Sequence, residues 1–169
     1  MENLQNKIRW ILEEKYQGKL TAKAKKDIQR LNVVEPLDYI IEFVDFLGCK
    51  IDLSRKPLIP RVETEFWVKE ALEKISHDFT SLKNHEIKIL DMFAGSGCIG
   101  IAVLRHIKNV YVTFTDSEQS ALRQVRINLK INKRLWANSH ELAHGGRGRC
   151  QLIKSDIFSN VKGRFDYIF

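Results

Sequence analysis

The sequence has 169 residues, which is enough for one ordinary domain or one domain with a small extension. Its apolar fraction of 44% and charged fraction of 29% indicate a chain with a buried core and argue against wholesale disorder. The net charge of +7 favours proximity to a polyanion such as RNA or the ribosome, although many soluble proteins are equally basic.

Export, membrane insertion and metal binding are not expected. No apolar run approaches the roughly 20 residues that span a bilayer, and the N-terminus lacks a signal-peptide pattern. Three cysteines without a CxxC pair indicate reduced thiols in a cytoplasmic protein. His140 and His144 have helical spacing, but two glycines follow them and no acidic partner is evident, so no metal site is predicted.

The N-terminal region, residues 1–47, is predicted to be a small helical domain. Two short helices are expected between residues 2 and 31, with Thr21 capping the second, whose lysines we interpret as a solvated face. Pro36 is expected to start a third, strongly apolar helix that runs through Leu47.

Residues 48–61 change to an alternating pattern that predicts a short β-hairpin and a linker. A helix with an apolar side is expected to follow the segment 61–65, and its early acidic residues suit the positive end of a helix dipole. Residues 62–169 are therefore assigned to the second domain.

The centre of that domain is a short apolar run, 87–93, followed by a glycine-rich turn and a helix-like pattern. Glycines at 95 and 97 allow a backbone to approach a nucleotide-like ligand closely, because no Cβ atom stands in the way. The first turn of the new helix offers free N–H groups.

Strands and helices alternate through the rest of the chain. Strands are predicted at 110–115, 150–154 and 165–169, with a helix at about 117–132 between the first two. Residues 133–149 are expected to form a basic surface insertion, interpreted as a solvated loop. This alternation predicts an α/β fold with βαβ units and a twisted parallel sheet.

The residues at the strand ends narrow the choice of ligand class. Gly95 to Gly100 match the GxGxxG dinucleotide fingerprint, and Asp116 lies 21 residues beyond Gly95, where an acid can bind ribose hydroxyls. Asp91 is unusual for a nicotinamide site, but a carboxylate there suits the sulfonium and amino groups of S-adenosylmethionine. Asp156 ends the third strand in the same way, with Ile157 expected beside the adenine. The alternative is that the three acids are merely helix caps.

Several segments resemble the HemK-type protein-(glutamine-N5) methyltransferases, over residues from about 30 to the end. They are Glu35-Pro36-Leu37-Asp38-Tyr39-Ile40, Leu58-Ile59-Pro60-Arg61-Val62-Glu63-Thr64-Glu65, Ile89 to Gly100, Asn128, Ser155-Asp156-Ile157-Phe158 and Phe165-Asp166-Tyr167-Ile168. The resemblance implies a Rossmann-like S-adenosyl-L-methionine-dependent methyltransferase sheet, of which this chain holds the first four strands, preceded by a small helical domain and a β-hairpin. It also implies methylation of the GGQ glutamine of a peptide chain release factor.

The resemblance carries over to particular positions. It places these residues at the cofactor: Asp91, Phe93, Ala94, Gly95, Ser96, Gly97, Asp116, Ser117, Asp156 and Ile157. It places Arg61, Glu63, Thr64 and Glu65 near the substrate entrance. Phe93 and Ala94 stand where the family has glycine and threonine, Val62 replaces a proline, and the helical domain is about half its usual length.

The family's catalytic Asn-Pro-Pro-Tyr motif, which holds the substrate amide nitrogen in line with the methyl group, does not occur in this sequence. We therefore expect no catalytic residue on this chain, no methyl transfer by the chain alone, a need for a missing C-terminal half, and an open sheet edge at the fourth strand. The alternatives are a fragment of a DNA or RNA adenine N6-methyltransferase, a non-catalytic S-adenosylmethionine-binding module and, last, a nicotinamide-dependent enzyme.

Overall fold

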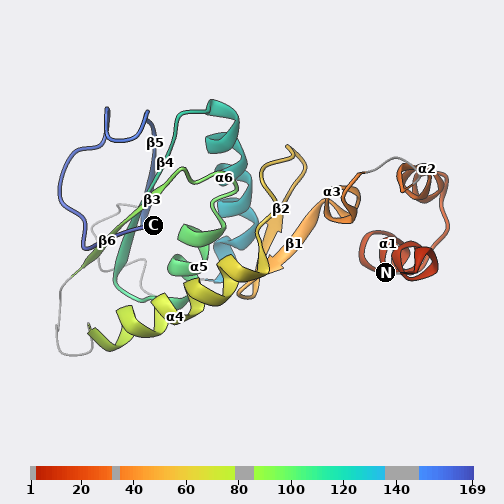
Figure 1. Cartoon of the computed structure of the whole chain (residues 1–169), viewed down its shortest axis with the longest axis horizontal. Coiled ribbons are helices and arrows are strands. Elements are labelled where there is room, and N and C mark those ends of the chain that lie inside the picture. The colour runs from red at the N-terminus through yellow and green to blue at the C-terminus, as the bar shows by residue number, and fades with distance from the viewer. Residues whose placement is uncertain (1–2, 32–34, 79–85, 136–148) are drawn as a thin grey trace.

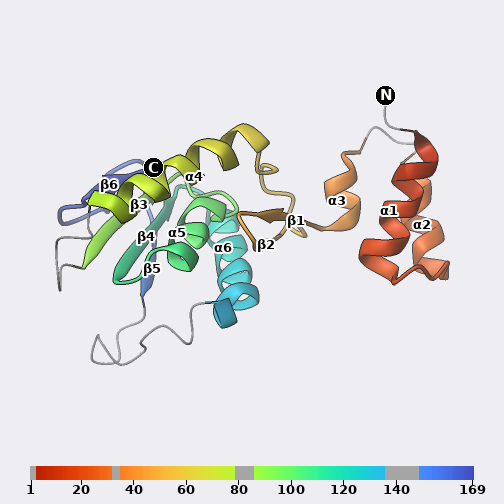
Figure 2. The ribbon, with the colours of Figure 1, turned by 90° about the horizontal axis from the view of Figure 1, so that it is seen from below.

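The computed structural model describes residues 3–31, 35–78, 86–135 and 149–169. A group of helices lies at one end of the molecule, a β-hairpin lies in the middle, and an α/β unit forms the other end (Figures 1 and 2). This arrangement agrees with the order of parts predicted from the sequence.

The helical part contains α1 (Leu4–Tyr16), α2 (Ala22–Arg30) and the short α3 (Leu37–Ile41). Thr21 caps α2 as predicted, because its Oγ1 accepts a hydrogen bond from the Ala24 amide at 3.1 Å. The three helices enclose a small apolar cluster whose buried members are Ile11, Ile40 and Ile41. Two predicted helices and their capping residue are thus confirmed.

The third helix is much shorter than predicted. It ends at Ile41 because Glu42 adopts a left-handed conformation with φ 71°. The next residues form strand β1 (Phe43–Phe46), which pairs antiparallel with β2 (Cys49–Asp52). The extension of the helix through Leu47 was wrong, and the predicted hairpin takes its first strand from that stretch. The predicted boundary between residues 47 and 48 falls within the hairpin turn.

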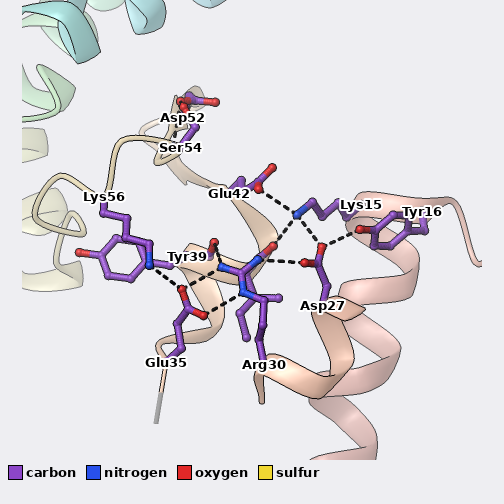
Figure 3. A network of polar contacts seen from close by, with 11 residues as sticks. Lys15, Tyr16, Asp27, Arg30, Glu35, Tyr39, Glu42, Asp52, Ser54 and Lys56 are labelled. Carbon is purple, nitrogen blue, oxygen red and sulfur yellow. Dashed lines mark hydrogen bonds and ion pairs between the residues drawn. The ribbon is translucent and has the colours of Figure 1, made fainter. Parts of the chain in front are cut away.

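A partly buried network of charges joins the helices to the segment that follows the hairpin (Figure 3). Lys15 Nζ lies 2.7 Å from Asp27 Oδ2, which also accepts a 2.6 Å hydrogen bond from the Tyr16 hydroxyl. Arg30 contacts Asp27 and makes a two-pronged contact with Glu35 at 2.8 and 2.9 Å. Lys15 belongs to α1, whereas the lysines of α2, Lys23, Lys25 and Lys26, are exposed as predicted.

The same network reaches beyond the helices. Lys56 Nζ lies 3.0 Å from Glu35 Oε1 (Figure 3). The Tyr39 hydroxyl donates to the carbonyl of Pro57 at 2.8 Å. The helical part is in this way fastened to the chain just before residues 61–65.

The α/β unit contains four parallel strands, in agreement with the predicted fold. Its elements are α4 (Val62–Asp78), β3 (Ile87–Met92), α5 (Cys98–His106), β4 (Val110–Asp116), α6 (Gln119–Asn132), the 3-10 turn η1 (Lys133–Leu135), β5 (Cys150–Lys154) and β6 (Tyr167–Ile168). The sheet order is β5-β4-β3-β6, with every neighbouring pair parallel. Most of the predicted 133–149 insertion, with His140 and His144, lies outside the described residues.

The direction in which the strands are added to the sheet reverses at β3. The chain moves outward from β3 through β4 to β5 and then returns to the other side of β3 with β6. Ligands of open α/β sheets bind beyond the carboxyl ends of the strands where the order reverses. The glycine turn follows β3 at this point.

One face of the sheet packs against α4, α5 and α6. The core residues there come from all three helices and from the strands: Val68, Leu72, Ile75, Ile87, Ile89, Ile101, Leu104, Val110, Val112, Phe114 and Val125. Strand β6 lies at the edge of the described sheet, with Ile168 half exposed. Among the described residues no helix is long and apolar enough to cross a membrane.

Candidate cofactor site

The turn after β3 is held in a conformation that requires glycine. Gly95 and Gly97 have φ values of 54° and 76°, and Gly97 forms the N-cap of α5. A Cβ atom on Gly97 would lie 3.0 Å from Cγ2 of Val125 in α6. Phe93 also has a positive φ, 58°, and its side chain is largely exposed beside the turn. The turn is therefore tight, with Ala94, Ser96 and Gly97 buried and Phe93 exposed beside them.

Asp91 lies in β3, directly below the turn and almost completely buried. Its Oδ2 accepts a hydrogen bond from the amide of Gly100 in the first turn of α5 at 2.9 Å. Burial, reinforced by the charge of Asp116 and opposed by the Gly100 amide, raises the pKa of Asp91 to about 7. No lysine or arginine among the described residues makes an ion pair with it.

Gly100 is the residue that lets Asp91 approach α5. A Cβ atom built on Gly100 would lie 2.8 Å from Asp91 Oδ2 and 2.3 Å from Cε1 of the Phe114 ring. The last glycine of the GxGxxG motif thus serves close packing between helix, strand and carboxylate. Its effect on a ligand is indirect.

Asp116 ends β4 and is bound on both oxygens. Oδ2 accepts from the Gly95 amide at 3.0 Å, and Oδ1 accepts from the Glu118 amide at 2.9 Å. The first contact fastens the glycine turn, and the second closes a turn immediately before α6. Ser117, between them in sequence, is exposed. The N-cap of α6 is Glu118, which has no side-chain cap hydrogen bond, so Asp116 is not the helix cap that the capping alternative expected.

The aspartate that follows β5 is more exposed than the aspartates of β3 and β4. Asp156 and Ile157 are exposed, and Ile157 adopts φ 47°. The buried Ser155 holds this turn, since its hydroxyl donates to the Ile157 carbonyl at 2.9 Å and accepts from the Asn160 amide at 3.0 Å. The Ser155 amide in turn donates to the Asp116 carbonyl at 3.0 Å. The segment after β5 thus lies against the end of β4.

The predicted substrate-proximal residues form the start of α4. Arg61 and Glu63 are exposed, and Thr64 and Glu65 are half buried. Glu65 has a structural contact that the sequence did not predict, because its Oε1 accepts a 2.7 Å hydrogen bond from the Leu47 amide in the hairpin turn. The side chain of Arg61 makes no hydrogen bond with any residue that the structure describes.

Three amides on one face of α6 were missed by the reasoning from the sequence. Gln124, Asn128 and Asn132 are all buried, and all bind backbone atoms of the β2 region. Their spacing of four residues was the available signal, since it aligns polar side chains on one face of a helix. Asn128 had been noted only as part of a family resemblance.

The described residues fit a ligand that carries a positive charge and lies against the turn. A buried carboxylate with one hydrogen-bond donor is costly unless a cation or a further donor approaches it. A diphosphate would instead meet the negative charges of Asp91 and Asp116. The chemistry of these side chains favours the cationic methionine end of S-adenosylmethionine.

Comparison with protein families gives a match to the methyltransferase small domain over residues 75–169, which is more than half of the chain. The chain belongs to this family. The match covers β3, the glycine turn, Asp91, Asp116 and the β5 end, so these site residues lie within the part that defines the family.

Curated relatives carry more specific names. The chain is 31% identical over 156 residues to the release factor glutamine methyltransferase of Borreliella burgdorferi, a match that covers 88% of this chain and 47% of that protein. It is 35% identical over 142 residues to the protein of the same name from Buchnera aphidicola, covering 83% and 44%. It is 30% identical over 141 residues to the ribosomal protein uL3 glutamine methyltransferase of Francisella tularensis, covering 83% and 40%.

These matches confirm the HemK-type resemblance that the motifs indicated. The chain spans about half the length of the curated relatives it matches. The relatives' names describe two protein substrates, a release factor and a ribosomal protein.

Proposed function

We propose that the chain forms the S-adenosylmethionine-binding part of an enzyme that methylates a glutamine side-chain amide in a protein of the translation apparatus. The observation that carries this proposal is the buried carboxylate of Asp91 beneath the glycine turn, which accepts one hydrogen bond from Gly100 and makes no ion pair with any residue that the structure describes. It gives the sulfonium and amino groups of the cofactor a partner, and methyl transfer is the chemistry that the cofactor supplies when bound.

The other site residues have roles that follow from their positions. Asp116 orients the turn, and its position at the end of β4 supports a contact with the ribose hydroxyls of the cofactor. Phe93 and Ile157 are exposed apolar side chains at the same end of the sheet, suited to cover the cofactor's apolar surface. Phe93 to Gly97, Ser117 and Asp156 complete the proposed binding set.

The comparisons support the substrate class less narrowly than the cofactor. Relatives that act on release factors and a relative that acts on ribosomal protein uL3 match to similar extents. Both are proteins of translation, which supports a protein substrate in the cytoplasm and fits the basic charge of +7. Arg61, exposed at the start of α4, and Glu63 are the proposed contacts to it.

The chain contains no Asn-Pro-Pro-Tyr sequence, so we do not assign it a residue that positions the substrate amide. The carbonyl of Phe169 accepts a hydrogen bond from the Met92 amide at 2.9 Å, so the end of β6 lies beside the start of the glycine turn.

Radiolabelled methyl transfer tests the proposal. The 169-residue chain and a longer version that carries the motif are incubated with labelled S-adenosylmethionine and with a release factor, protein uL3 or adenine-containing nucleic acid. We expect labelled glutamine in one of the two proteins, only with the longer version. Labelled adenine and unlabelled proteins would reject the proposal in favour of a nucleic-acid methyltransferase.

A further inference from the structure

Strand β2 has one edge paired with β1 and another that faces α6. The backbone groups on the second edge are bound by side-chain amides. Asn132 accepts from the Lys50 amide at 3.0 Å and donates to the Lys50 carbonyl at 2.8 Å. Asn128 accepts from the Asp52 amide at 2.7 Å. The helix in effect replaces a third strand.

Gln124 extends the row at the end nearest the substrate segment. Its Nε2 donates to the Asp52 carbonyl at 2.7 Å, and its Oε1 accepts from the Arg55 amide at 3.2 Å. Exposed strand edges are prone to pairing with other chains, and this edge is covered completely by side chains of one helix. The row fixes the hairpin to the α/β unit.

Asn128 differs from the other two amides because it also touches the glycine turn. Its Nδ2 donates to the Ser96 carbonyl at 2.9 Å, and its side chain is fully buried. Val125, one turn earlier on α6, packs against Gly97. One amide side chain therefore joins the centre of the turn to the edge of the hairpin.

The hairpin also holds both ends of the segment that carries Arg61 to Glu65. At one end the chain leaves β2 at Asp52, next to Asn128. At the other end Glu65 Oε1 accepts from the Leu47 amide in the hairpin turn at 2.7 Å. A shift of the hairpin would thus shift the proposed substrate residues relative to the glycine turn.

We propose that Asn128 is a positioning residue that couples the cofactor turn to the hairpin, so that the turn and the Arg61–Glu65 segment keep one fixed spacing. The inference rests on the proposed function for its biological meaning. The coupling itself is a property of the ligand-free chain and is testable without the cofactor.

Asn132 supplies the matched control. Asn128→Asp and Asn132→Asp each keep the acceptor oxygen for a hairpin amide and lose the donated hydrogen bonds. Only the first loses a bond to the glycine turn. If Asn128→Asp does not fold, the smaller, uncharged pair Asn128→Ser and Asn132→Ser is compared.

The first measurement is amide hydrogen exchange on the ligand-free chain. We expect Asn128→Asp to speed exchange both in residues 50–55 and in residues 94–98, and Asn132→Asp to speed it only in residues 50–55. Unchanged exchange in residues 94–98 of the Asn128 variant, or equal acceleration there in both variants, would overturn the coupling.

The second measurement is the affinity for S-adenosylmethionine. Leaving the Ser96 carbonyl without its donor is expected to weaken binding about tenfold in Asn128→Asp, with a change below about twofold in Asn132→Asp. Equal losses in the two variants would reject the positioning role. If the unmodified chain binds no S-adenosylmethionine, the proposed function fails, and the exchange comparison still decides the coupling.

Discussion

The amide of Gly95 donates to Oδ2 of Asp116 over 3.0 Å, while Oδ1 of the same carboxylate accepts from the Glu118 amide. One side chain thus fastens the glycine turn to the neighbouring strand and closes the turn that leads into α6. A residue predicted to bind a ligand turns out to shape the backbone that would bind it.

Replacing Asp116 by alanine is expected to release the turn. Both accepted hydrogen bonds are lost, and a net loss of about 1–3 kcal/mol is typical for removing a charged acceptor of this kind. We expect S-adenosylmethionine affinity, measured by calorimetry, to fall at least tenfold. Asp156→Ala, which removes an exposed carboxylate at the next strand end, is the comparison. A larger loss with Asp156→Ala would show that the adenine side, and not the turn, dominates binding.

Asp91 predicts an unusual dependence of stability on pH. Burial raises its pKa from 3.8 to about 7, so the folded chain holds a proton that the unfolded chain has already released between those pH values. The contribution of this group to stability therefore falls as the pH rises from about 4 to 7 and stays lost above.

Asp91→Asn should remove that dependence, because the amide carries no charge and its oxygen still accepts from Gly100. Each pKa unit corresponds to about 1.4 kcal/mol, so the shift of about three units predicts that the variant is more stable than the unmodified chain at pH 8 by on the order of 4 kcal/mol. Urea unfolding of both chains at pH 8 and pH 4 measures this difference in the free energy of unfolding. Equal stability of the two chains at pH 8 would contradict the burial cost assigned to Asp91.

The network in Figure 3 predicts the opposite trend in acid. Burial alone would raise the pKa of Asp27, but hydrogen bonds from Lys15, Tyr16 and Arg30 lower it to about 2. Hydrogen bonds from Arg30 and Lys56 lower the pKa of Glu35 to about 2 as well. Their stabilising contributions are present above the ordinary pKa values and are lost as the pH falls toward 2.

We expect the helical part to lose structure in acid before the α/β unit does. Asp27→Asn leaves the partly buried Lys15 without its closest carboxylate and should cost about 2 kcal/mol or more at pH 7, with a flatter acid response. Circular dichroism during acid titration, with Glu13→Gln in an exposed ion pair as the control, measures both effects. An unchanged acid midpoint in Asp27→Asn would contradict this role of the network.

Gly100→Ala tests the close approach of α5 to β3. The added methyl group would lie 2.3 Å from the Phe114 ring and 2.8 Å from Asp91 Oδ2, so the helix must move outward. Overpacking of this kind typically costs about 1–3 kcal/mol. Gly18→Ala, where nothing lies within 4 Å and only the positive φ is unfavourable, separates backbone strain from overpacking. A smaller loss for Gly100→Ala than for Gly18→Ala would contradict the packing account.

The sequence predicted the α/β unit well because its signals were local and consistent. An apolar run, two glycines and a helix-period pattern in succession predict a strand, a tight turn and a helix. Parallel pairing of successive strands then predicts that the acids at their carboxyl ends lie at one edge of the sheet. The helix predicted through Leu47 failed because Ile40, Ile41, Val44 and Leu47 satisfy a helical spacing over a short stretch, whereas pairing of β1 with β2 depends on residues farther along the chain.

Long-range contacts account for the features that were missed. Asn128 and Asp52 are 76 residues apart, and Lys15 and Asp27 come from different helices. Neither pairing has a local signature. The conformations of Glu42 and Leu47, with φ values of 71° and 49°, likewise depend on the hairpin that they serve.

Calorimetric titration of S-adenosylmethionine into the unmodified chain and into Asp91→Asn tests the central claim most directly. The account predicts one binding site in the unmodified chain, with affinity that rises between pH 6 and pH 8 as Asp91 ionises, and at least a tenfold loss in Asp91→Asn despite its greater stability. Equal binding by both chains, or binding of a nicotinamide dinucleotide in place of S-adenosylmethionine, would contradict it.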